Sequence, residues 1–186
     1  MRLFIAIDVP YSEVLSKAYS DLKRTGRGLR PTIPENQHIT LKFLGDPGCS
    51  IDDVVRSLND ISDLPGPYVM GIDEAGAFPS WKRPSVLWIG MTNSVLMKQM
   101  AERIDEELHR AISSPLERRP FKGHMTIARI KGNVNVGVTR DILERMVREL
   151  KEEGYSIPVG NFKLISSVLT PDGPKYETLS THSLNG

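Results

Sequence analysis

Two short segments of the chain, 86 residues apart, repeat one pattern: a histidine followed two residues later by a threonine. Residues 38–41 read His-Ile-Thr-Leu, and residues 124–127 read His-Met-Thr-Ile. In both segments polar and apolar residues alternate, which is the period of a half-buried β-strand. The pattern therefore predicts two strands that bury one face and present an imidazole and a hydroxyl on the other.

The rest of the chain alternates between strand and helix patterns. We expect strands over residues 2–9, 36–44, 68–77, 84–91, 123–130, 156–170 and 175–182, with a turn at Pro171-Asp172-Gly173-Pro174 before the last one. Apolar residues recur at helical spacing over 11–23, 51–61, 94–112 and 139–151, whereas 24–35 is expected to be a loop. No long linker interrupts residues 1–186, so the chain is predicted to be a single α+β domain.

Composition limits the class of protein. A content of 39% hydrophobic and 25% charged residues fits a globular protein with a core, and a net charge of +1 means that any nucleic-acid surface must come from local clustering. Cys49 is the only cysteine, which suits a reducing compartment. The apolar run at the N-terminus is short and interrupted by Asp8, so a strand is a better interpretation than a signal peptide. We expect a cytoplasmic protein without a membrane span.

The paired motifs suit a displacement at phosphorus. Opening a cyclic phosphodiester needs a base for the attacking water and an acid for the departing alkoxide, on opposite sides of the phosphorus. Imidazole, with an ordinary pKa of about 6.5, supplies both forms near neutral pH. We therefore expect His38 and His124 to form the acid–base pair, and the hydroxyls of Thr40 and Thr126 to donate to the phosphate oxygens.

A zinc site is the alternative interpretation of the two histidines. Zinc sites usually take three protein ligands, and neither motif contains a carboxylate, a cysteine or a third histidine. We therefore expect no metal and no cofactor, although a ligand from a distant segment stays open. Of the other histidines, His109 is expected to interact with a helix C-terminus and His182 to lie on the surface.

Several basic residues are candidates to bind the phosphate or the backbone that adjoins it. They gather around the second motif, and Arg129 is the favoured one, although a flat strand would place it on the face opposite His124. Its use would require a bulge, a strand end or a long reach. Lys42 is expected to share the face of His38, where it is either a phosphate contact or an exposed strand lysine. The basic residues near the second motif are Arg118, Arg119, Lys122, Arg129 and Lys131.

Aromatic side chains are candidates to stack on a base. Phe43 and Tyr176 are candidate substrate-binding residues, although the alternation of residues 36–44 favours a core position for Phe43. Trp88 is also expected to lie in the core. Phe78 and Trp81 flank a turn with Lys82 and Arg83, which favours the rim of a substrate site.

The segments NQHITLKFLG and RPFKGHMTIAR resemble the 2H phosphoesterase superfamily, and more narrowly the RNA 2',3'-cyclic phosphodiesterases, also called 2'-5' RNA ligases. RLFIAIDVP, RPSVLWIG and SSVLTPDGPKY resemble the same family, so the similarity spans nearly the whole chain. One departure is Gly123, where members often have Pro before the second His.

The resemblance implies a bilobal fold of two antiparallel sheets with outer helices, a pseudo-twofold axis and a central cleft that holds both motifs. It implies hydrolysis of the terminal 2',3'-cyclic phosphate of RNA to a 2'-phosphomonoester, with His38 as proton donor and His124 as proton acceptor. Thr40, Thr126 and Arg129 would contact the phosphate, without metal or ATP. It also implies possible 2'-5' joining of RNA ends, such as tRNA halves, by a protein that we expect to be a monomer.

Two other functions stay open from the sequence alone. One is a module that binds RNA ends without turnover. The other is a related phosphodiesterase that acts on small cyclic nucleotides or on cyclic ADP-ribose phosphate.

Overall fold

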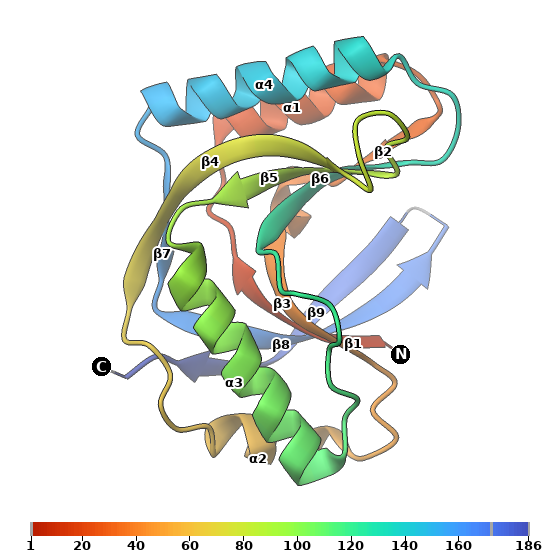
Figure 1. Cartoon of the computed structure of the whole chain (residues 1–186). Coiled ribbons are helices and arrows are strands. Elements are labelled where there is room, and N and C mark those ends of the chain that lie inside the picture. The colour runs from red at the N-terminus through yellow and green to blue at the C-terminus, as the bar shows by residue number, and fades with distance from the viewer. Residues whose placement is uncertain (1, 172, 186) are drawn as a thin grey trace.

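A computed structural model describes residues 2–171 and 173–185. Its strands form one curled antiparallel path, in the order β7-β4-β5-β6-β3-β1-β8-β9, and the short β2 pairs with β6 outside this path (Figure 1). The strands are β1 (Arg2–Asp8), β2 (Leu29–Pro31), β3 (His38–Gly45), β4 (Tyr68–Phe78), β5 (Val86–Met91), β6 (His124–Ile130), β7 (Ser156–Val159), β8 (Asn161–Thr170) and β9 (Gly173–Ser183).

The path consists of two four-stranded halves that meet between β3 and β6. We call β3-β1-β8-β9 the first half and β7-β4-β5-β6 the second half. At the joint the only registered pair, within the described residues, is Ile39 opposite Met125, and both side chains are fully buried. The expectation of an α+β fold with antiparallel strands and outer helices is confirmed, with the two sheets continuous at this pair.

The helices exchange halves. They are α1 (Glu13–Arg24), α2 (Ile51–Asn59), α3 (Ser94–Ile112) and α4 (Val136–Glu152). Helix α1 follows β1 of the first half but packs with α4 over the second half, whereas α3 follows β5 of the second half but packs with α2 against β3 (Figure 1). Each half is therefore covered by one helix that follows a strand of the other half.

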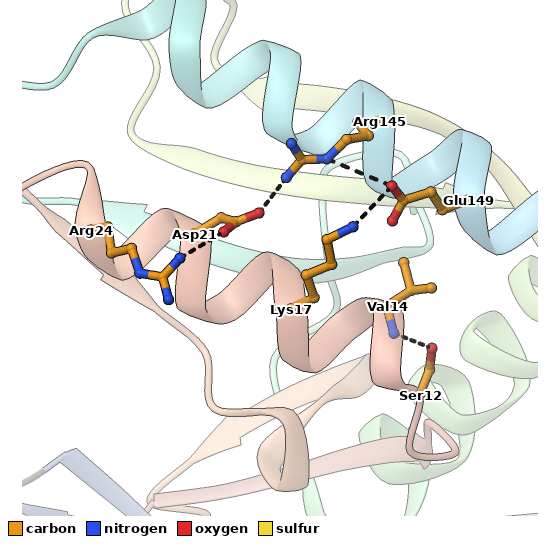
Figure 2. Close-up of polar contacts among 7 residues, drawn as sticks. All are labelled: Ser12, Val14, Lys17, Asp21, Arg24, Arg145 and Glu149. Atoms are coloured by element: carbon orange, nitrogen blue, oxygen red, sulfur yellow. Dashed lines mark hydrogen bonds and ion pairs between the residues drawn. The ribbon is translucent and has the colours of Figure 1, made fainter.

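Helices α1 and α4 are joined by ion pairs as well as by apolar contacts. Figure 2 shows that Arg145 of α4 pairs with Asp21 of α1, and that Lys17 of α1 reaches Glu149 of α4 at 3.3 Å. Ser12 precedes α1 as its N-cap: its side chain accepts from the backbone N–H of Val14 at 3.1 Å, so the first turn is capped. Below these contacts, the buried faces of both helices join the main core, which fixes their position over the second half.

Two expectations about the elements were wrong in detail. The predicted loop over 24–35 contains β2, because residues 29–31 pair with the end of β6. The 3-10 helix η1 (Pro34–Asn36) overlaps the end of the same predicted loop. The strand predicted over 156–170 is broken at Gly160, since β7 pairs with β4 and β8 pairs with β1. The chain thus crosses from one half to the other at this glycine. Asp172 of the predicted turn lies outside the described residues.

Candidate functional site

The joint between the halves brings the two motifs together. Ile39 lies opposite Met125 in an antiparallel register, so continuing it by one residue each way places His38 opposite Thr126 and Thr40 opposite His124. Because residues i and i+2 of a strand share a face, all four polar side chains lie on the face away from the buried Ile39 and Met125. His38 and His124 are therefore diagonal neighbours on the two strands. Residues in this relation are about 7–8 Å apart, a separation that accommodates one phosphate between the imidazoles.

Each motif strand carries a β-bulge directly after its threonine. In β3 the partners in β1 pass from Thr40 to Lys42, so Leu41 is left unpaired with that strand. In β6 the partners in β5 pass from Thr126 to Ala128, so Ile127 is left in the same way. A bulge shifts the later side chains to the other face. The fifth residue after each histidine, Phe43 or Arg129, consequently lies on the motif face.

The bulge in β3 corrects the expectation for Lys42. Its side chain is only 6% exposed, pairs with Asp105 of α3 and donates to the carbonyl of Pro115 at 2.7 Å. It therefore lies on the helix-covered face, away from His38, and its proposed contact with phosphate is wrong. The core position favoured for Phe43 is wrong too, because this side chain is 62% exposed and stacks on Phe4 at 5.8 Å.

The two imidazoles are held by matching hydrogen bonds. Nδ1 of His38 lies 2.7 Å from the carbonyl oxygen of Asn36, and Nδ1 of His124 lies 2.7 Å from that of Lys122. A carbonyl can only accept, so Nδ1 carries a proton in both rings and donates it. This fixes the tautomer and leaves Nε2 as the atom that exchanges protons at the site. Both carbonyls belong to the residue two positions before the histidine, a contact that strand periodicity does not predict.

Aromatic rings pack against both imidazoles. The ring centre of His38 lies 5.0 Å from that of Phe4 and 5.3 Å from that of Tyr176, which it meets edge-on. The ring centre of His124 lies 5.0 Å from that of Phe78, which it meets edge-on, and 6.2 Å from that of Trp88. Phe78 and Tyr176 thus lie beside the motifs, as expected. Phe4 was missed, because every residue from Leu3 to Ile7 is buried and gives no alternation.

Trp81 is not among the aromatic residues that pack against the two imidazoles. Its ring lies 5.3 Å from the guanidinium of Arg140 on α4, so it packs toward this helix and not against the imidazoles. Trp88 is buried as expected, but beside His124; a Cβ at Gly76 would lie 2.0 Å from its ring, so glycine is required there.

Burial and charge lower the pKa of both motif histidines. For His38 the largest cause is burial, the Asn36 carbonyl opposes it, and the positive charge of Arg129 lowers the pKa further. For His124 burial is again the largest cause, followed by the opposing Lys122 carbonyl and then the Arg129 charge. Arg129 also acts on the pKa of Tyr176, so one guanidinium is near both imidazoles and this phenol. The bulge in β6 is the condition under which we expected Arg129 to reach this face.

A pocket of about 620 Å³ opens beside His38. It is lined by the end of β1, by η1 and by parts of β8 and β9; among its lining residues are Asp8, Asn36, His38, Lys163 and Tyr176. Lys163 pairs with Asp8 across it. The histidine motifs therefore lie next to a space large enough for part of a nucleotide.

One further expectation changes in the structure. His182 is not on the surface: it is 6% exposed, stacks on Phe162 and has Asn59 and Ser180 at hydrogen-bond distance. At Gly123, where family members often have Pro, a Cβ would lie 1.8 Å from the terminal methyl of Met97, so the Met97 side chain would have to move. In the part of the chain that the structure describes, no group of three or more His, Cys, Asp or Glu side chains is placed to bind a metal. None of the described helices is long and apolar enough to cross a membrane.

Comparisons with known proteins agree with this geometry. Residues 5–88 match the family model described as LigT like Phosphoesterase. The chain is 32% identical to the RNA 2',3'-cyclic phosphodiesterase of Archaeoglobus fulgidus over 96% of this chain and 98% of that protein, and 32% identical to the Methanothermobacter thermautotrophicus protein of the same name over 99% of both. The structure of the protein TT0787 of Thermus thermophilus superposes with a TM-score of 0.75 at 27% identity, covering 100% of this chain and 99% of that one.

Proposed function

The chain belongs to the LigT-like phosphoesterase family, and on that premise we propose that it is an RNA 2',3'-cyclic phosphodiesterase, a hydrolase that opens the cyclic phosphate at an RNA end. The membership predicted from the two motifs is confirmed by relatives of this name that match nearly the full chain. The observation that supports the chemistry best is the pair of imidazoles on one face of the joint, each with Nδ1 bound to a carbonyl.

In the proposed reaction the phosphorus lies between the two Nε2 atoms. His124 takes a proton from water, whose oxygen attacks the phosphorus, while His38 gives its proton to the 3'-oxygen as the P–O3' bond breaks. The product is a 2'-phosphomonoester with a free 3'-hydroxyl, and proton exchange with solvent restores both imidazoles. The lowered pKa of His124 favours the neutral form that a base requires, whereas the lowered pKa of His38 means that this acid takes up its second proton only at lower pH.

Charge that develops on the phosphate needs donors, and we assign these to Thr40, Thr126 and Arg129. Within the described residues no protein group hydrogen-bonds to either threonine hydroxyl, and Arg129 forms no ion pair, so all three can donate to phosphate oxygens. The exposed ring of Phe43 and the phenol of Tyr176 flank the motifs, and we assign them contacts with the sugar or base.

The experiment uses adenosine 2',3'-cyclic phosphate and follows the product by phosphorus NMR, which separates 2'-phosphate from 3'-phosphate. We expect turnover in the presence of EDTA, because no step uses a metal. His38→Ala and His124→Ala should each lower the rate at least about 10²-fold. His109→Ala, which changes an exposed histidine at the end of α3, is the matched control and should keep the rate. Full activity in either motif variant would refute the assignment.

Finer parts of the function follow from the same site. A 5'-hydroxyl in place of water would give a 2'-5' linkage, so we propose that ends such as tRNA halves can be joined in that way. We also propose that the enzyme acts as a monomer in the cytoplasm, with both halves forming one catalytic unit. Incubating a cyclic-phosphate RNA with a 5'-hydroxyl RNA tests the joining step, and light scattering tests the oligomeric state.

A further inference from the structure

Six exposed cations gather at one end of the site. They come from three segments, residues 27–34, 79–86 and 124–134, and none of these segments contains a carboxylate. The six are Arg27, Arg30, Lys82, Arg83, Arg129 and Lys131. In a chain of net charge +1, this is a local excess of positive charge that overall composition does not reveal.

The six cations share a lack of carboxylate partners. Twelve of the 24 lysines and arginines form ion pairs, including those on the helices of Figure 2. Within the described residues, none of the six cations does so. An exposed, unpaired cation keeps its capacity to bind a phosphate, because no neighbouring carboxylate has to be displaced.

Strand pairing places the three segments side by side. Arg129 of β6 lies opposite Arg30 of β2 on one side and opposite Val86 of β5 on the other. The turn that carries Lys82 and Arg83 leads directly into Val86, and the backbone N–H of Lys131 donates to the carbonyl of Gly28 at 2.7 Å. Figure 1 shows β2, the β4–β5 turn and the end of β6 together at one end of the second half. We call the six cations the basic edge.

The basic edge lies at the His38 end of the joint. Beyond Thr126, strand β6 runs beside the segment that precedes His38, since the backbone N–H of Thr32 donates to the carbonyl of Ile127 at 2.8 Å. Arg129 belongs to the edge and its charge acts on His38, so the edge begins at the site itself. A strand of RNA that leaves the motifs on this side of His38 therefore lies within reach of these cations.

Reaction geometry indicates which part of the substrate lies at this end. His38 protonates the 3'-oxygen, which stays on the terminal ribose, whereas water arrives from the His124 side. In an in-line displacement the leaving oxygen and the nucleophile lie on opposite sides of the phosphorus. The ribose, and the RNA attached through its 5'-carbon, therefore extend from the His38 side.

We propose that the basic edge binds the backbone phosphates of the nucleotides that precede the cyclic end, so that the enzyme prefers oligonucleotides to mononucleotides. This inference rests on the proposed function. Phosphates supply the charge that unpaired arginines and lysines bind, and single-stranded RNA has one phosphate per nucleotide. The edge adds affinity for the RNA chain without contributing a group to the bond-breaking step.

The test compares adenosine 2',3'-cyclic phosphate with an eight-nucleotide RNA that ends in the same cyclic nucleotide. The variant Lys82→Ala/Arg83→Ala removes two charges from the edge and leaves the motifs intact. We expect the KM of the oligonucleotide to rise about 10-fold and the slope of its log KM against log salt to fall by about 1.4, or 0.7 per lost phosphate contact. Turnover of the mononucleotide should not change.

The matched control is Arg148→Ala/Lys151→Ala, which removes two exposed charges from α4 on the outer side of the second half. It should leave both substrates unchanged. Equal KM values for the two substrates in the unmodified enzyme, or an edge variant that behaves like the control, would overturn the inference. If the unmodified enzyme hydrolyses neither substrate, the proposed function fails instead, so the two failures are distinguishable.

Discussion

Replacing Lys42 with methionine tests whether this lysine stabilises the fold or contacts substrate. Its buried ammonium pairs with Asp105 and donates to the carbonyl of Pro115. Methionine keeps the apolar stem but leaves the Asp105 carboxylate with the backbone N–H of Glu117, 2.9 Å away, as its remaining partner. Removing one partner of a buried pair costs about 3–5 kcal/mol. Because the Asp105 side chain is 16% exposed, we expect the lower end, about 3 kcal/mol.

Thermal and urea unfolding measure this effect. A loss of about 3 kcal/mol lowers the melting temperature of a chain this long by about 6–12 °C. The double variant Lys42→Met/Asp105→Leu should recover about half of the loss, because it removes the unpaired charge as well. At a temperature where all variants are folded, kcat/KM should stay within about threefold of the unmodified enzyme. If the stability of Lys42→Met is unchanged and its kcat/KM falls strongly, the buried placement of Lys42 is refuted and a contact between Lys42 and the phosphate is indicated instead.

Three other predictions follow. Burial and the Arg129 charge lower the pKa of both motif imidazoles below 6.5, so kcat/KM should be greatest below about pH 6.5. Because Arg129→Gln removes the positive charge, it should shift both limbs of the pH profile to higher pH, and limbs that do not shift would contradict this. Burial also lowers the pKa of His182, so the unfolded chain takes up a proton first and the free energy of unfolding should fall as pH drops below 6.5. Urea titrations at pH 7 and pH 5 should show a smaller fall for His182→Gln than for the unmodified protein. An equal fall would exclude a buried, neutral His182 as its cause. Gly76→Ala should cost about 1–3 kcal/mol and shift the fluorescence of Trp88, whereas Gly160→Ala, with nothing within 4 Å of the added Cβ, is the control; an unshifted spectrum would count against the packing described.

The two motif strands show how far sequence periodicity reaches. Alternation from His38 to Leu41 and from His124 to Ile127 predicts the strands and the shared face of each His and Thr. It fails one residue later, because a bulge has no reliable signature when the residues around it are apolar. Phe43 fits an inward position in the sequence and is exposed in the structure, while Lys42 fits an outward position and is buried.

The remaining differences between the predicted and the observed structure come from contacts between residues that are distant in the sequence. Nothing in the run 156–170 except Gly160 indicates that β7 joins one half and β8 the other, since each segment alone has a strand pattern. His182 lies four residues from the end of the chain, a position usually exposed, but the stack on Phe162 and the contact with Asn59 require neighbours that are distant in the sequence. The basic edge could not be predicted either, because its six cations come together only through β2, β5 and β6.

The exchange of helices makes the two halves dependent on each other for folding. A fragment that ends before β5 lacks α3, and a fragment that begins there lacks α1, so each would expose the apolar surface that the missing helix covers. Partial unfolding of one half therefore removes the cover of the other, and the chain should unfold in one cooperative step. A protein cut within the turn at residues 79–85 should regain structure only when both pieces are mixed, because β3 lies in one piece and β6 in the other.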